Sequence, residues 1–164
     1  MSVALRNAQR AVPLRRAPLG SAVRALRAAL GASSFDVGLV CAGDRLMRRL
    51  NGAYRCCPRP TDVLSFPYHR LQPGQLPRPS CRDDYNLGDI FLGVEYIHRQ
   101  CCRTGEDFHS VLVVTAAHGL CHLLGYQHNT EPEWRQMYEK ELEILEVLNR
   151  QSGSNLQPLT AGLF

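Results

Sequence analysis

Hydrophobic and polar positions in the first half of the chain follow two spacings, one typical of strands and one of helices. Three short apolar segments bounded by glycine, proline or polar residues predict strands at residues 3–10, 35–43 and 61–67. Val23, Leu26 and Leu30 fall on one face of a helix that Gly31 would end. Asp44 is placed to cap the helix that follows it. The first half therefore alternates strands with amphipathic helices.

The second half contains one more strand candidate and is otherwise helical. Residues 87–94 form a compact apolar run, after a proline- and glycine-rich loop over residues 69–86. Residues 95–102 predict a short helix. Residues 108–124 are apolar on almost every side, which predicts a buried central helix despite a β-branched run that locally favours a strand. An amphipathic helix follows at residues 131–149, and its acidic side chains predict a solvated face.

Length and composition restrict the architecture. The chain has 164 residues, 45% of them hydrophobic, which is enough for one core but not for two independent domains. We therefore predict one domain over residues 1–150 and a tail over residues 151–164. No run approaches the roughly 18 consecutive apolar residues of a membrane span, so a soluble protein with no membrane partner is expected. Seven cysteines without a C-x-x-C motif predict free thiols rather than disulfides or cysteine-bound zinc.

Positive charge is concentrated at the start of the chain. The net charge is +4, and the first 35 residues hold six arginines and no acid, whereas acidic residues outnumber basic ones in the remainder. This arginine-rich, amphipathic opening is typical of an organelle transit peptide and equally of a first strand and helix, and both interpretations stay open. It predicts the mitochondrion as the compartment, with the cytoplasm or the nucleus as alternatives.

The strongest chemical signal is the segment HGLCHLLGYQH, residues 118–128. His118 and His122 are four residues apart, so on a helix their imidazoles share one face. Gly125 can end that helix and turn the chain, which lets His128 supply a third nitrogen. Three neutral nitrogens with a fourth position open describe a catalytic rather than a structural zinc site.

The spacing of these histidines matches the metzincin peptidase motif except at Gly119, which stands where the catalytic glutamate belongs. In a peptidase that glutamate takes a proton from the zinc-bound water, and glycine cannot do this. Peptidase activity is therefore disfavoured. Three uncharged ligands also leave the +2 charge of the ion unneutralised, which favours an anionic substrate such as a phosphodiester.

With these residues assembled, the chain resembles the YbeY family of zinc-dependent endoribonucleases, the rRNA maturation factors. The resemblance covers most of the chain through four motifs in order: LNGAYR, PTDVLSFPY, NLGDIFLG and HGLCHLLGYQH, which start at residues 50, 60, 86 and 118. It extends to MYEKELEIL, which starts at residue 137. One departure is Gln127, at a position where the family usually has an aspartate.

The resemblance implies an α+β fold, in which a small mixed sheet packs with about five helices and the metal site lies at the end of the central buried helix. It implies one zinc ion per chain, bound by His118, His122 and His128. The implied activity is cleavage of single-stranded RNA during ribosomal RNA maturation and ribosome assembly. Arg55, the last residue of the LNGAYR motif, is then a substrate-binding or catalytic residue. The implied protein partners are ribosomal small-subunit proteins or assembly factors.

Asp62 and Ser65, in the third predicted strand, are weaker candidates for substrate contact, because turn capping and local hydrogen bonds explain such residues equally well. The alternative function is a non-catalytic, zinc-stabilised binding factor in ribosome assembly, which would have the same basic cleft without cutting RNA. A metallopeptidase that takes its base from elsewhere in the chain is a third hypothesis. Cleavage of RNA that depends on both the metal and Arg55 distinguishes the first hypothesis from the others.

Overall fold

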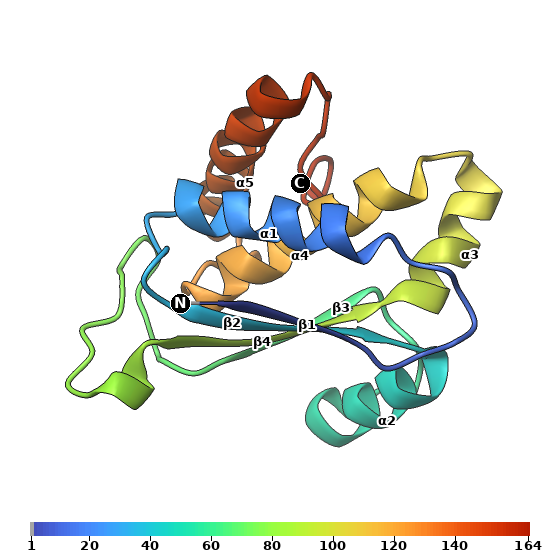
Figure 1. The fold of residues 1–164 in the computed structure, drawn as a ribbon, viewed down its shortest axis with the longest axis horizontal. Helices are drawn as coiled ribbons and strands as arrows, with labels where there is room; N and C mark the ends of the chain where they lie inside the picture. Colours follow the sequence, from blue (N-terminus) through green and yellow to red (C-terminus); the bar gives the residue numbers. More distant parts are fainter. Residues whose placement is uncertain (1) are drawn as a thin grey trace.

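The computed structural model describes residues 2–164, which form a four-stranded sheet and five α-helices (Figure 1). In chain order the elements are β1 (Val3–Asn7), α1 (Arg16–Ala29), β2 (Asp36–Ala42), α2 (Asp44–Arg55), β3 (Val63–Pro67), β4 (Asn86–Gly93), α3 (Val94–Thr104), α4 (Phe108–Leu123) and α5 (Glu131–Ser152). A short 3-10 turn at Arg82–Asp84 precedes β4. The predicted α+β class with a small mixed sheet and five helices is confirmed.

The sheet has the strand order β1-β2-β4-β3. Strands β1, β2 and β4 run parallel, and β3 pairs antiparallel with β4 at one edge. In this register Ser65 lies opposite Ile90, and α4 packs directly over that part of the sheet. The edge strand β3 therefore brings its side chains close to the helix that carries the histidine motif.

The helices form layers on both faces of the sheet. Helices α1 and α4 cover one face, α5 packs on these two helices on the same side, α2 lies on the opposite face, and α3 lies at one end (Figure 1). The larger core fills the space between the sheet and the three helices, where Leu39, Ile90 and Leu120 are fully buried. A smaller apolar cluster under α2 contains Met47 and Leu64. Within residues 2–164, no helix combines the length and the apolar character needed to cross a bilayer.

The arginine-rich opening of the chain is part of this fold. Strand β1 pairs along its length with β2, and α1 buries Val23 and Leu26 in the larger core. The residues whose composition also suggests a transit peptide therefore form an edge strand and a covering helix. Their removal would leave the hydrogen-bonding edge of β2 unpaired and the apolar surface beneath α1 exposed.

The start of α2 differs from the prediction. Gly43 is the N-cap, and Asp44 is the first helical residue rather than the cap. The Asp44 carboxylate instead pairs with the guanidinium of Arg99 in α3. A negative charge in the first helical turn is also favourable beside the positive end of the helix dipole. Sequence alone does not separate these two positions, because caps and first-turn acids have nearly the same signature.

The residues after α5 pack back onto the helices. The backbone of Leu156 is held by the side chain of Asn149, which accepts from its N–H (2.8 Å) and donates to its carbonyl (3.1 Å). Thr160 is fully buried, and its carbonyl accepts from the indole N–H of Trp134 (2.8 Å). This segment therefore has a fixed place in the fold, unlike the loose tail that its composition suggests. The domain boundary at residue 150 stays a prediction.

Candidate active site

The three histidines of the motif meet at the C-terminal end of α4. The nitrogen atoms of His118, His122 and His128 that could bind a metal all lie within 4.8 Å of one another. The chain turns after α4 at Gly125, whose φ is +90°. A Cβ atom there would lie 2.4 Å from the carbonyl oxygen of Leu71, so a larger residue does not fit. The predicted glycine turn that returns His128 to the helix end is confirmed.

Hydrogen bonds fix which nitrogen of each helical histidine faces the centre. Nδ1 of His118 lies 2.8 Å from a carboxylate oxygen of Glu141, and Nδ1 of His122 lies 2.8 Å from the carbonyl oxygen of Tyr126. Both partners accept, so each Nδ1 carries the proton and donates it. The two unprotonated Nε2 atoms then face each other at 3.0 Å. Two lone pairs at this distance repel each other but suit a shared cation, so the donor set fits a metal ion.

The surroundings of His122 keep its imidazole neutral. Burial, together with the neighbouring His118 and His128 and the guanidinium of Arg55, lowers the pKa of His122 to about 3, although the hydrogen bond to the Tyr126 carbonyl acts in the opposite direction. Neutral imidazole is the form that binds metals, and the low pKa means that protons do not compete for this ligand near neutral pH.

Glu141 is a functional residue that the sequence analysis missed. Its carboxylate is fully buried, with one oxygen beside Nδ1 of His118 and the other accepting from the hydroxyl of Thr160. The prediction that the acidic residues of the last helix form a solvated face is wrong at this position. A signal was present, because Glu141 falls on the same helical stripe as the buried Met137 and Leu145.

The packing of α4 on the sheet explains the missing peptidase glutamate. A Cβ atom on Gly119 would lie 2.9 Å from Cγ2 of Ile90 and 3.2 Å from Oγ of Ser65. The hydroxyl of Ser65 also donates to the carbonyl of Gly119 (3.2 Å), which ties β3 to the helix. Position 119 therefore faces the sheet at close approach, and any side chain there would push α4 away from β3 and β4.

We expect Gly119→Ala to lower the free energy of unfolding by about 1–2 kcal/mol, because overpacking against a stiff β-branched neighbour outweighs the gain in helix propensity. The matched control is Gly52→Ala in α2, where the new Cβ would meet Pro58 at 3.4 Å, an ordinary contact. That variant should be more stable by about 0.5–1 kcal/mol. Urea unfolding of both metal-free variants measures the difference. Equal stabilisation by the two alanines would show that α4 has room at position 119.

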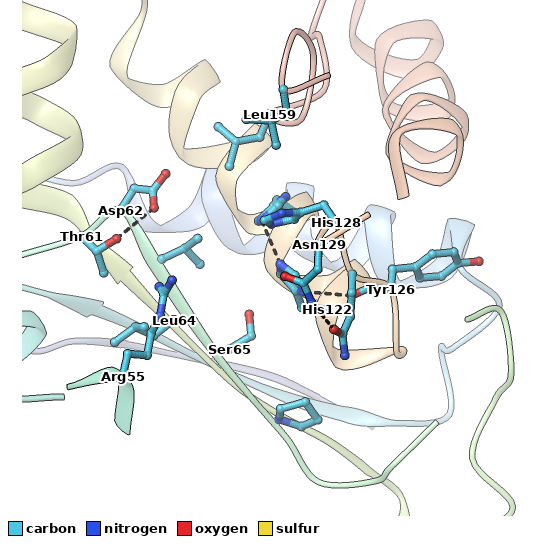
Figure 2. Close-up of a pocket in the computed structure, with 15 residues that line it drawn as sticks. Arg55, Thr61, Asp62, Leu64, Ser65, His122, Tyr126, His128, Asn129 and Leu159 are labelled. Atoms are coloured by element: carbon cyan, nitrogen blue, oxygen red, sulfur yellow. Dashed lines mark hydrogen bonds between the residues drawn. The ribbon is translucent and has the colours of Figure 1, made fainter. Parts of the chain in front are cut away.

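A cavity of about 620 Å³ opens in front of the histidines. Figure 2 shows Arg55 and Asp62 on one wall and His122 and His128 on the other, with Ser65 between them. The side chain of Arg55 is exposed and makes no ion pair among residues 2–164. The fold therefore brings every residue that the sequence analysis selected as a site candidate to one cavity. The roles of these residues stay predictions.

Further residues of this cavity were not selected from the sequence. Gln127, at the position where an aspartate is usual, accepts a hydrogen bond from the side chain of Asn129 (2.9 Å), and both residues line the cavity. Leu159 and Leu163, from the segment after α5, also line it. The C-terminal segment thus contributes apolar surface to the site, which periodicity could not indicate because the segment has no regular secondary structure.

Comparisons with known proteins agree with this geometry. The family described as Endoribonuclease YbeY matches residues 10–149. A human protein named Endoribonuclease YbeY is 54% identical over 165 residues, and the match covers 100% of this chain and 98% of the human protein. The protein of that name from Bartonella bacilliformis is 38% identical, and the match covers 74% of this chain and 73% of the bacterial protein. The solution structure of TM1509 from Thermotoga maritima has the same fold, with a TM-score of 0.55 at 18% identity, covering 96% and 98% of the two chains. The chain belongs to the YbeY family.

Proposed function

We propose that the protein is a zinc-dependent endoribonuclease that cleaves single-stranded RNA. The observation that carries this proposal is the convergence of two Nε2 lone pairs 3.0 Å apart, across one cavity from Arg55, which forms no ion pair within residues 2–164. The names of the relatives support the reaction class. The absence of a carboxylate at position 119 supports a phosphodiester rather than a peptide substrate, because the peptidase base is missing.

The proposed roles follow from the position of each side chain. His118, His122 and His128 would hold the zinc ion, and Glu141 and the Tyr126 carbonyl keep two of these imidazoles in the metal-binding tautomer. Zinc, when bound, supplies a Lewis acid and lowers the pKa of a bound water.

Arg55 would bind the nonbridging oxygens of the scissile phosphate, where negative charge grows in the transition state. The carboxylate of Asp62 would repel a phosphate but can accept a hydrogen bond from a ribose hydroxyl. The hydroxyl of Ser65 already donates its hydrogen bond to the carbonyl of Gly119, so only its oxygen lone pairs remain to accept from a substrate donor.

The test is a nuclease assay on protein of known metal content. We expect about one zinc per chain as purified, loss of cleavage after chelation, and recovery when zinc is restored. Single-stranded oligoribonucleotides should be cut faster than duplexes, and peptides should not be cut. Cleavage that persists in metal-stripped protein would contradict the proposal. Tight RNA binding without cleavage by the zinc-loaded protein would support the binding factor instead.

We further propose that ribosomal RNA is the natural substrate and that small-subunit proteins or assembly factors deliver the enzyme to it. The motifs shared with the YbeY family support this assignment. The mitochondrion is the proposed compartment, on the basis of the arginine-rich first 35 residues. Because those residues form β1 and α1, they would have to act as a targeting signal without being removed.

A further inference from the structure

A second cavity lies beside the first and shares two residues with it. It has a volume of about 550 Å³ and lies between the C-terminal end of α2, the chain that follows it, and α3. Arg55 and Thr61 line both cavities. The remaining walls include Arg59 and Arg99, and no lining residue is acidic. A cavity lined by three arginines therefore adjoins the metal site.

Two of the three arginines form no ion pair with any residue that the structure describes. Neither Arg55 nor Arg59 forms an ion pair among residues 2–164, and the guanidinium of Arg59 donates a hydrogen bond to the thiol sulfur of Cys57 (3.4 Å). Arg99 is different, because its guanidinium pairs with both carboxylate oxygens of Asp44 and lies 5.8 Å from the ring centre of Tyr96. The cavity therefore has excess positive charge at the side nearest the metal site, which suits an anionic ligand.

The chain that carries Arg59 is held in place without a ligand. The side chain of Asn51 is buried in α2 and donates to the carbonyl of Arg59 (2.9 Å), while the carbonyl of Asn51 accepts from the backbone N–H of Cys57 (3.2 Å). Cys56 takes a left-handed conformation (φ 54°), which ends the helix sharply. Prolines at positions 58 and 60 restrict the rest of the turn. Arg59 is thus presented on a preorganised segment, which reduces the entropy lost on binding.

We infer that this second cavity binds the phosphate of a nucleotide next to the cleavage position. The inference rests on the proposed function, because it takes the metal cavity as the place of the scissile phosphate. RNA repeats its negative charge at every nucleotide, so a strand that enters the first cavity brings further phosphates to its border. Arg55 stands at that border and Arg59 beyond it. Guanidinium groups bind phosphate oxygens through paired N–H donors, which fits the contacts that both residues leave open.

The test compares Arg59→Ala with Arg103→Ala, using the zinc-loaded protein. Arg103 is an exposed arginine of α3 that lines neither cavity, so its loss changes the net charge equally. We expect Arg59→Ala to raise KM for a single-stranded decaribonucleotide about tenfold, more than it lowers kcat, and to reduce the salt dependence of binding by about one phosphate contact. For a dinucleotide with a single phosphate the effect should be smaller. Arg103→Ala should change neither substrate's KM by more than about twofold.

A chemical change in the RNA makes the test specific. In a set of decaribonucleotides, each phosphate in turn is replaced by a neutral methylphosphonate. At one position beside the cleaved bond, the replacement should weaken binding to the wild type but not to Arg59→Ala, because both changes remove the same contact. If, at every position, the affinity lost through the methylphosphonate adds to the affinity lost in Arg59→Ala, the subsite proposal is overturned. Equal KM changes for Arg59→Ala and Arg103→Ala would also overturn it, even if the RNA is still cut, so the proposed function can survive its failure.

Failure of the endoribonuclease proposal can also be distinguished from failure of the phosphate subsite. If the wild type binds the decaribonucleotide by fluorescence anisotropy but does not cut it, the endoribonuclease proposal fails. A loss of affinity in Arg59→Ala that the methylphosphonate cancels would then still establish the phosphate subsite. Inorganic phosphate at millimolar concentration should compete weakly with the RNA in the wild type. Tight competition by phosphate alone would contradict a site built for a strand.

Discussion

Replacement of Arg55 by alanine should lower the rate of RNA cleavage by roughly 10²- to 10³-fold, the loss seen when one preorganised donor to a developing oxyanion is removed. Arg55 faces the histidine cluster across the cavity and is not engaged in an ion pair among residues 2–164. Its guanidinium is therefore free to pair with phosphate oxygens as their charge grows. The zinc content should not change, because Arg55 neither binds the metal nor contacts Glu141.

Two further variants separate charge from geometry. Arg55→Lys should recover only part of the lost rate, because an ammonium keeps the charge but not the planar pair of donors. Arg48→Ala removes an exposed arginine from the same helix, away from both cavities, and should leave kcat/KM nearly unchanged. Single-turnover cleavage and elemental analysis of all three variants are the measurements. A wild-type rate in zinc-loaded Arg55→Ala would remove Arg55 from the catalytic residues.

Much of the fold was predictable because periodicity reports which face of an element is buried. The stripe of Val23 and Leu26 predicted α1, and the motif spacing placed the metal site at the end of α4. The β-branched run at residues 111–115 favoured a strand locally, but it lies in a helix enclosed by the sheet and other helices. Burial of the whole helix outweighed the local preference there, and only the length of the apolar segment indicated this.

What the sequence could not supply are contacts between distant elements. The tightness of Gly119 against Ile90 depends on how closely α4 approaches β4, which no local pattern records. The pairing of Asp44 with Arg99 joins residues that are 55 positions apart. The second cavity arises because the turn after α2 meets α3, and Arg59 there looks in sequence like any solvated arginine. Each of these features requires the packing of one element on another, whereas periodicity describes single elements.

The contact of Glu141 with His118 also joins two distant elements. Glu141→Gln should weaken zinc binding about 10- to 100-fold, the usual effect of losing the group that orients a ligand histidine. Both oxygens of the carboxylate are acceptors in use, one for His118 and one for Thr160. An amide has a single acceptor oxygen, so it can serve only one of them and must turn its NH₂ group toward the other. If the NH₂ group faces Nδ1, His118 loses its hydrogen bond or its metal-binding tautomer. If the amide oxygen faces Nδ1, His118 keeps a hydrogen bond but to a neutral acceptor in place of the carboxylate, and the NH₂ group then faces the backbone N–H of Thr160.

Removal of the whole carboxylate should also destabilise the metal-free protein. Glu141→Ala leaves the buried Nδ1–H of His118 and the buried hydroxyl of Thr160 without their acceptor, and we expect the free energy of unfolding to fall by about 3–5 kcal/mol. Thr160→Val leaves the contact with His118 intact, so it should lower stability by only about 1–2 kcal/mol and change zinc affinity little. A comparison of Glu141→Ala with Thr160→Val therefore separates the orientation of His118 from the stability of the segment after α5.

Zinc affinity is measured by competition with a chromophoric chelator, and stability by urea unfolding of the metal-free proteins. The matched control is Glu139→Gln, which makes the same chemical change at an exposed position of α5 and should alter neither quantity. Unchanged zinc affinity in Glu141→Gln would mean that the tautomer of His118 is fixed without the carboxylate. If Thr160→Val loses zinc affinity in proportion to its loss of stability, then Glu141 affects zinc binding by stabilising the fold rather than by orienting His118.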